Sequence, residues 1–238
     1  MTGHRLRAAA LLVAALLAGP VAAQAPGAPT IVIDPGHPSE TAPGNVLLNG
    51  AREVEIAWST SLLLRDLLRA EGMRVVLTKH TVGQMVTNRR RAEIANEAGA
   101  TLLVRLHTDA GSGRGFALYY PDRQGTVAGT TGPARSVIEA SERAARVLHR
   151  AMARALRGHL YDAGIKGDSE TYVGSRQGAL TGSIFSRVPA VTIEMVYLTN
   201  ADDAKFIRTP EGQRSMARAI AQGVIAWTRE SARSSPAR

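Results

Sequence analysis

The sequence contains no cysteine among its 238 residues. This absence excludes disulfide bonds, thiolate zinc sites, cysteine nucleophiles and a lipid-modified N-terminal cysteine. Aromatic residues are also scarce, at 4% of the chain, and they are not interleaved with basic residues. We therefore expect no nucleic-acid partner despite the net charge of +9, because single-stranded nucleic acids are held by stacking on aromatic side chains.

Long apolar runs are absent except for one near the N-terminus. Residues 1–23 contain Arg5 and Arg7, an apolar stretch from Ala8 to Ala18, and small residues ending at Ala23. The stretch is too short to span a bilayer as a helix, and this order of features is typical of a cleaved signal peptide. We predict export to the periplasm, cell wall or extracellular space, with no membrane span left after cleavage. Removal of Arg5 and Arg7 leaves 27 basic and 20 acidic residues, a net charge of +7.

The remaining chain is expected to form a single α/β domain over residues 31–228, after a linker at 24–30 and before a disordered tail at 229–238. Apolar strand-like segments alternate with segments of helical spacing, which indicates a mostly parallel central sheet flanked by helices. A monomer is the expected state. Strands are predicted at 31–33, 74–78, 102–106, 115–120 and 190–194, and helices at 52–70, 89–98, 136–156, 201–206 and 210–228.

Polar residues follow three of the predicted strands. His37 comes after the first strand, His107 directly follows residues 102–106, and Glu194 ends the segment 190–194. The carboxyl ends of parallel strands meet at one edge of a sheet, so these side chains can converge. Two imidazoles and one carboxylate, with a position for water, make a typical catalytic zinc site. The carboxylate ligand is expected from Glu53 or Glu55, with Glu194 as the general base.

A histidine at the end of a strand is more often a surface residue than a ligand. His80 also follows a predicted strand, so position alone does not exclude it. His149 lies within a predicted helix beside Arg146 and Arg150, where a solvated face is the better interpretation. Patterning by itself therefore favours a metal hydrolase without deciding its ligands.

Six short phrases follow one another along residues 31–207 and contain His37, Glu53, His107 and Glu194. The phrases are Ile31–His37, Arg52-Glu53, Val75–Thr78, Arg91–Asn96, Leu103–Ala110 and Pro189–Asn200. In this order they resemble the zinc-dependent N-acetylmuramoyl-L-alanine amidases of type 3, a family of cell-wall hydrolases.

The resemblance implies hydrolysis of the amide between N-acetylmuramic acid and the L-alanine of the peptidoglycan stem. It assigns one Zn²⁺ to His37, Glu53 and His107, and the catalytic role to Glu194. Helix register also favours Glu53 over Glu55. Peptidoglycan is the expected partner, and an activator protein is a second candidate.

The chain departs from the family pattern at Pro38, Arg105 and Asp109. These positions belong to the expected substrate groove, so they bear on specificity more than on metal binding. The glycine-rich residues 111–134 and 157–183 do not suggest the inhibitory helix of some family members, and we expect a constitutively open site.

Two other functions remain open at this point. A zinc peptidase with the same site would cut between amino acids of the wall peptide. A catalytically silent wall-binding or amidase-activating protein of the same fold would bind without cutting. The presence of all four polar site residues argues against the silent protein, and the position of the cut distinguishes the two hydrolases.

Overall fold

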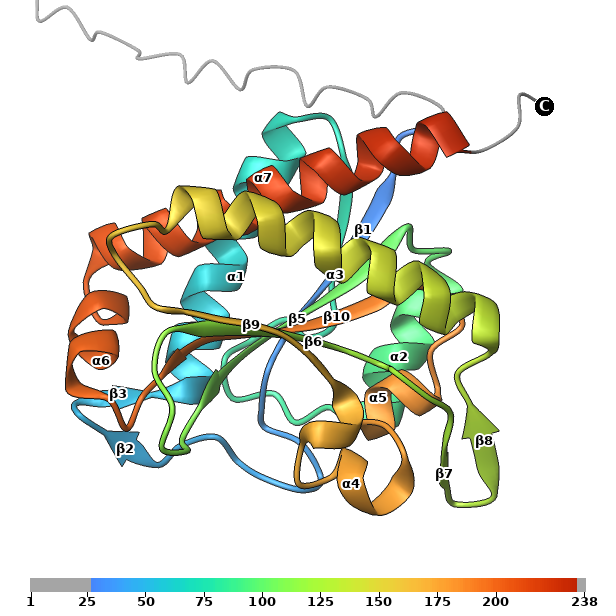
Figure 1. Cartoon of the computed structure of the whole chain (residues 1–238), viewed down its shortest axis with the longest axis horizontal. Helices are drawn as coiled ribbons and strands as arrows, with labels where there is room; N and C mark the ends of the chain where they lie inside the picture. Colours follow the sequence, from blue (N-terminus) through green and yellow to red (C-terminus); the bar gives the residue numbers. More distant parts are fainter. Residues whose placement is uncertain (1–26, 235–238) are drawn as a thin grey trace, which may run out of the picture.

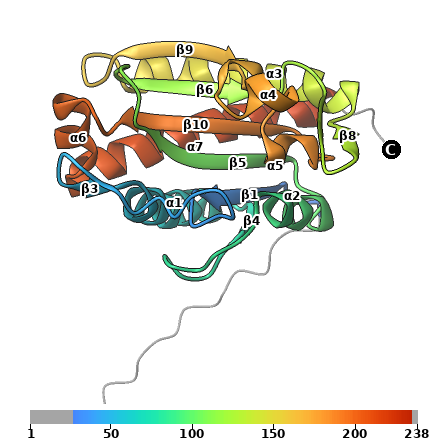
Figure 2. The ribbon, with the colours of Figure 1, turned by 90° about the horizontal axis from the view of Figure 1, so that it is seen from below.

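Six strands form the central sheet of the structure, a computed structural model that describes residues 27–234 (Figure 1). Their order across the sheet is β4-β1-β5-β10-β6-β9, and Figure 2 shows the strands lying side by side. The first four are parallel, whereas β6 is antiparallel to β10 and parallel to β9. The mostly parallel sheet is thereby confirmed. The strands are β1 Thr30–Pro35, β4 Arg74–Leu77, β5 Leu102–Asp109, β6 Phe116–Tyr120, β9 Asp162–Gly167 and β10 Ala190–Tyr197.

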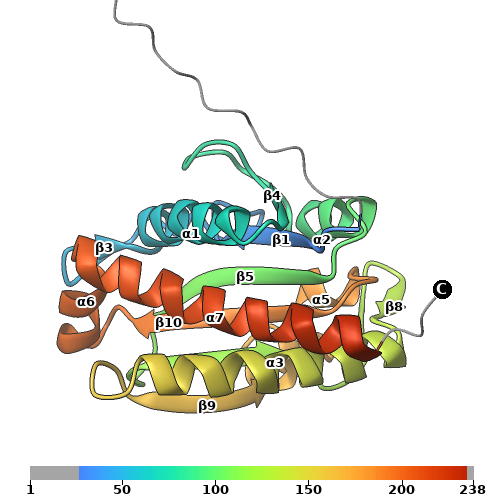
Figure 3. The same ribbon diagram turned by 90° about the horizontal axis from the view of Figure 1, so that it is seen from above.

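Three long helices cover one face of this sheet, as Figure 3 shows. They are α1 (Glu53–Ala70), α3 (Arg135–Ala155) and α7 (Pro210–Ser234). In α1, the buried residues Ala57, Ser61, Leu64 and Leu68 recur at helical spacing and form the stripe that meets the core. Each of the three helices contributes to one continuous apolar cluster with the strands.

The opposite face of the sheet holds a smaller apolar cluster and then the polar residues of interest. Val32, Leu103 and Ala190 pack there with residues of α2 (Asn88–Glu97). Side chains alternate along a strand, so the residues two and four positions further on share this face. The alternation therefore places the following side chains on the side of α2: Asp34, Arg105, His107, Thr192 and Glu194.

Shorter elements surround this second face. Figure 1 shows α4 and α5 below the sheet, opposite α3 and α7. None of the described helices has the length and apolar character needed to cross a membrane. These elements are β2 Leu47–Leu48, β3 Ala51–Arg52, β7 Gly125–Val127, β8 Thr130–Gly132, η1 Asp168–Glu170, α4 Gly174–Gln177, α5 Thr181–Ile184 and α6 Ala201–Ile207.

The end of α7 differs from the sequence prediction. The helix continues through Ser234, although we expected a disordered tail from residue 229. Residues 229–234 contain neither glycine nor proline, so nothing in them ends a helix that is already anchored by the buried Trp227. The predicted signal peptide (1–23), the linker residues 24–26 and the tail residues 235–238 lie outside the described residues.

Two strands also extend further than predicted. Pairing between β5 and β10 continues to Asp109 and Tyr197. His107 and Glu194 therefore lie within their strands and not at the strand ends. The sequence prediction ended each strand where apolar residues give way to polar ones. Backbone pairing continues past a polar side chain, so the predicted strands ended too early.

Candidate metal centre

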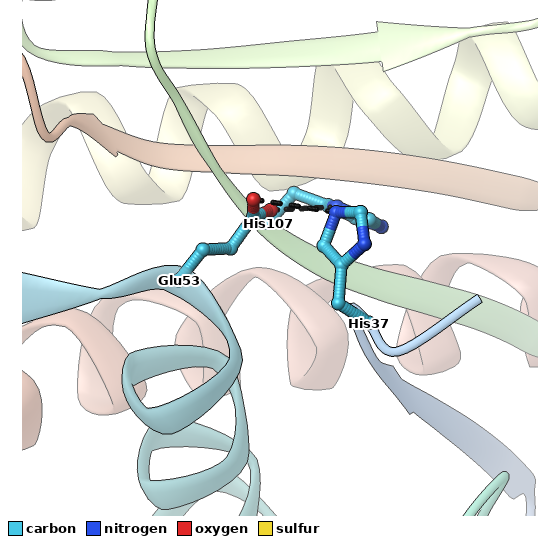
Figure 4. A group of neighbouring side chains, drawn as sticks. All are labelled: His37, Glu53 and His107. Atoms are coloured by element: carbon cyan, nitrogen blue, oxygen red, sulfur yellow. Dashed lines mark hydrogen bonds and ion pairs between the residues drawn. The ribbon is translucent and has the colours of Figure 1, made fainter. Parts of the chain in front are cut away.

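Two histidines and one glutamate lie together at the carboxyl-terminal side of β1 and β5 (Figure 4). His37 follows β1, Glu53 is the first residue of α1, and His107 belongs to β5. Glu53 lies between the two imidazoles: its Oε1 is 2.9 Å from His107 Nδ1, and its Oε2 is 3.2 Å from His37 Nε2. One ligand atom of each residue lies within 4.8 Å of the other two.

This donor set fits a single zinc ion. Two imidazole nitrogens and one carboxylate oxygen are the three protein ligands of a common catalytic zinc site, and water or substrate takes the fourth position. The three side chains are between 15% and 20% exposed, so the cluster faces solvent on one side. That exposed side leaves room for the fourth position.

Two glycines allow the imidazoles to approach. A Cβ at Gly36 would stand 2.7 Å from His107 Nδ1, and one at Gly44 would stand 2.4 Å from His37 Cβ. Gly44 also has a left-handed φ of +64°, which glycine adopts without steric cost. His37 itself has a φ of 52° and is followed by a cis peptide bond to Pro38.

The electrostatics of the cluster suit cation binding. Burial raises the pKa of Glu53, but the hydrogen bonds to His107 and His37 outweigh burial and lower this pKa to about 2. Burial lowers the pKa of His107. At His37 burial also lowers the pKa, but the hydrogen bond to Glu53 outweighs burial and the pKa of His37 is raised. The lowered pKa values keep Glu53 ionised and favour neutral His107, which are the forms in which these groups ligate metals, and a metal at His37 would compete with the proton that Glu53 favours there.

Glu194 lies on the neighbouring strand, directly across from His107 in the pairing of β10 with β5. Its Oε2 is buried and has no hydrogen-bond partner among the described residues. Burial raises the pKa of Glu194 well above its usual value, and the nearby carboxylates Glu53 and Asp109 raise it further. An orphaned carboxylate beside a ligand cluster fits a group that handles protons during a reaction.

A buried ionic cluster supports the turn that bears His37. Asp34 is fully buried and bonds Arg91 and Thr78 through Oδ1, while its Oδ2 accepts from Arg105 Nε at 3.1 Å. Arg91 also donates to the carbonyls of Pro35 and Pro38 on either side of the turn. Sequence reasoning missed this cluster. The available signal was Arg91 beside the apolar Ala92 and Ala95 on one face of a short helix.

Two hollows meet at the ligand cluster. The larger, about 480 Å³, contains Glu194 and Arg105 among its lining residues. The smaller, about 260 Å³, is bordered by the apolar residues Val46, Leu48 and Leu198. His37 and Glu53 line both hollows, so the cluster lies where a larger cleft rich in polar residues, the polar cleft, meets a smaller apolar groove, and an extended substrate can enter both.

The other candidates from the sequence are not part of the cluster. Glu55 is 60% exposed and lies 4.0 Å from Arg52, so the structure places Glu53 and not Glu55 between the histidines. His80 is exposed. His149, expected on a solvated face, instead contacts Asp162 through Nε2 at 2.7 Å and connects α3 to β9.

Comparison with known proteins identifies relatives along most of the chain. A family profile described as N-acetylmuramoyl-L-alanine amidase matches residues 31–226. An N-acetylmuramoyl-L-alanine amidase of Mycobacterium tuberculosis is 28% identical over 195 residues, which make up 78% of this chain and 73% of that protein. The range matched by the family profile contains the whole His37, Glu53 and His107 cluster and Glu194.

Solved structures share the fold. The apo N-acetylmuramyl-L-alanine amidase Ami1 from Mycobacterium abscessus has a TM-score of 0.71 at 24% identity, over 84% of this chain and 98% of that chain. The CwlD amidase from Clostridioides difficile, solved in complex with the GerS lipoprotein, has a TM-score of 0.64 at 20% identity, over 85% and 99% of the two chains. At these identities the likeness shows the arrangement of sheet and helices.

Proposed function

The chain belongs to the N-acetylmuramoyl-L-alanine amidase family, and from this premise we propose that His37, Glu53 and His107 bind one Zn²⁺ for peptidoglycan hydrolysis. The bond cut is the amide between N-acetylmuramic acid and the L-alanine of the stem peptide. The observation that carries the proposal is the position of Glu53 between two imidazoles, with Glu194 on the adjacent strand, where its Oε2 has no hydrogen-bond partner among the described residues.

The residues divide the chemistry between them. When bound in such a site, zinc polarises the scissile carbonyl and lowers the pKa of a coordinated water toward 7. Glu194 accepts the proton of the attacking water and delivers it to the nitrogen of the leaving L-alanine. Glu194 is placed for both transfers because it lies directly across from His107 in the pairing of β10 with β5.

We also propose that the protein acts outside the cytoplasm. The signal-peptide pattern of residues 1–23 and the substrate of the family both support export. Peptidoglycan is the partner in this proposal, and a mature net charge of +7 favours contact with an anionic wall. An activator protein is a second candidate partner, since a structural relative was solved in complex with a lipoprotein.

A digest of purified peptidoglycan with residues 24–238 tests the activity. We expect stem peptides with a free L-alanine N-terminus, identified by mass spectrometry, with release abolished by a chelator and restored by zinc. Cuts within the stem would instead establish a peptidase. A zinc-containing protein that releases nothing from any wall preparation would support the silent or partner-activated alternative.

The variant Glu194→Gln tests the assigned proton carrier. It should retain zinc and substrate binding and lose about 100- to 10,000-fold in rate, the usual contribution of general acid–base catalysis. Near-full activity of a correctly folded, zinc-containing Glu194→Gln protein would show that another group moves the proton.

A further inference from the structure

The polar cleft and the apolar groove meet at the proposed zinc ligands, and the proposed role of Glu194 indicates which of the two receives the peptide. In the proposed reaction Glu194 protonates the leaving amine, so that amine must lie beside Glu194. Glu194 lines the larger cleft and is not among the residues that border the smaller groove. The stem peptide therefore extends into the larger cleft, and the sugar with its lactyl group lies toward the apolar groove.

Arg105 lies at the floor of that larger cleft. It precedes His107 by two residues on β5, so both side chains are on the same face of the sheet. Strand geometry separates the two positions by roughly 7 Å. Its side chain is only 4% exposed, so the surrounding protein holds the guanidinium in place.

Two of the three nitrogens of the Arg105 guanidinium donate hydrogen bonds to described residues. Its Nε donates to Asp34 at 3.1 Å and its Nη2 donates to Asn88 at 2.9 Å. Nη1 has no acceptor in the described part of the chain. A Cβ at Gly182 would stand 3.1 Å from Nη1, so the absence of a side chain there leaves room for this end of the fork.

Arg105 makes its ion pair within the described residues with Asp34, a carboxylate that it shares with Arg91. Two further buried carboxyl groups, Asp168 and Glu194, lie near enough for the charge of Arg105 to oppose the rise that burial causes in their pKa. Neither of them is ion-paired or hydrogen-bonded to Arg105 in the described part of the chain, and Asp168 instead accepts from the backbone nitrogen of Leu180. A carboxylate of the substrate would accept a hydrogen bond from the remaining nitrogen, Nη1.

The chemistry of the stem supplies such a carboxylate at the right distance. The residue after L-alanine is a glutamate joined through its γ-carboxyl, and its α-carboxyl is either free or amidated. A chain advances at most about 3.3–3.6 Å per residue, so this group reaches roughly 7 Å beyond the scissile nitrogen. That span is close to the roughly 7 Å that separates the positions of His107 and Arg105 along β5.

We propose that Arg105 binds the free α-carboxylate of the second stem residue and makes the enzyme selective for stems that are not amidated at this position. This inference rests on the proposed function, because the direction of the peptide follows from the role of Glu194. An amide in place of the carboxylate would offer Nη1 a neutral acceptor, and a charge-assisted hydrogen bond is about twice as strong as a neutral one.

Two soluble muramyl peptides that differ only in this group, free acid or amide, provide the test. The zinc-loaded wild-type protein should cut the acid with a kcat/KM roughly 10- to 100-fold above that of the amide. Arg105→Ala should bring the ratio close to one, with the loss falling on the acid substrate. Arg105→Lys should keep part of the preference, because the charge remains but the fork is lost.

The matched control is Arg135→Ala, which removes an arginine that is 91% exposed on α3, on the far side of the sheet. Its ratio should equal that of the wild type. Thermal unfolding and zinc content identify any loss of fold. If Arg105→Ala does not fold, the ratio of kcat/KM for the acid to that for the amide, measured for Arg105→Lys and for the wild type, still tests the proposal. A purely structural Arg105 would lower both rates equally, and equal wild-type rates for acid and amide would overturn the proposal.

Calorimetric titration of Glu194→Gln with the same two peptides separates this inference from the proposed function. Tighter binding of the acid, lost in the Glu194→Gln/Arg105→Ala double variant, supports the carboxylate site even if no cleavage is found at L-alanine. Equal dissociation constants would overturn the carboxylate site while leaving the amidase activity unaffected.

Discussion

At the scale of single residues, the proposed function depends on which carboxylate faces the two histidines. Glu53 and Glu55 are two positions apart on α1, and both lie near the expected ligand position in the sequence. Residues two positions apart on a helix point in different directions, so only one of them can lie between His37 and His107. The structure gives that position to Glu53 and leaves Glu55 beside Arg52 in solvent.

A pair of matched substitutions tests this assignment. Glu53→Gln should weaken zinc binding by more than about 100-fold, the upper limit seen when outer partners of metal ligands are removed. Glu55→Gln changes the same chemical group and should leave zinc affinity unchanged. Competition against a chelator of known affinity measures both. Equal zinc affinity in the two variants would mean that Glu53 is not a ligand.

At the scale of elements, the site requires close contact between the turn after β1 and the strand β5. Gly36 is the point of closest approach, because a Cβ there would lie 2.8 Å from the carbonyl oxygen of Leu106 and 2.7 Å from His107 Nδ1. The backbone of Gly36 also donates to that carbonyl at 2.8 Å. The turn and the strand therefore position His37 and His107 as a unit.

Gly36→Ala should separate these two elements. We expect a loss of stability of about 1–3 kcal/mol from overpacking, together with weaker zinc binding. Gly83→Ala is the control, because a Cβ at Gly83 meets no atom within 4 Å. Chemical denaturation and zinc titration of both variants measure the effects. A Gly36→Ala protein with wild-type zinc affinity would show that the turn can move away without disturbing the ligands.

At the scale of the whole molecule, folding depends on burying charge at the centre of the site face. Asp34, Arg91 and Arg105 come from β1, α2 and β5, and all three are almost fully buried. Removing one partner of such a cluster leaves an uncompensated charge in a poorly solvated place, which is strongly destabilising. The cluster therefore links the folding of three elements to the geometry of the site.

This cluster predicts a loss of stability in acid. Burial raises the pKa of Asp34, but Arg91 and Arg105 outweigh it and lower this pKa from 3.8 to about 2. A carboxyl whose pKa is lower in the folded state stabilises the protein above its unfolded pKa, and this contribution disappears as the pH falls toward the folded pKa. Asp34 should thus contribute about 2 kcal/mol above pH 4 and lose it between about pH 4 and pH 2.

Denaturation of the metal-free protein across this pH range, compared with Asp34→Asn, isolates the contribution. The variant should be less stable at neutral pH, and its stability should change less between pH 4 and pH 2. Parallel pH curves for the two proteins would mean that Asp34 does not titrate with a lowered pKa.

The class of fold follows from the sequence alone. Apolar residues that recur at every second position indicate strands, those that recur every 3.6 positions indicate helices, and polar residues after buried strands mark where ligands gather. This pattern predicted that His37, His107 and Glu194 converge, and the structure places His37 close to His107 and Glu194 directly across from His107. The resemblance of the six phrases predicted the zinc chemistry that we propose for these residues.

Only the tertiary structure decided the details that depend on contacts between distant segments. The resemblance and the helix register favoured Glu53 over Glu55, and the structure shows the contacts that place Glu53 between the two histidines. The burial of Asp34 with Arg91 and the position of Arg105 in the cleft likewise join segments from different elements. Such contacts depend on packing distances of a few ångströms, which no local periodicity records. The ends of β5, β10 and α7 were misjudged for the same reason, because pairing and anchoring continue where the local pattern ends.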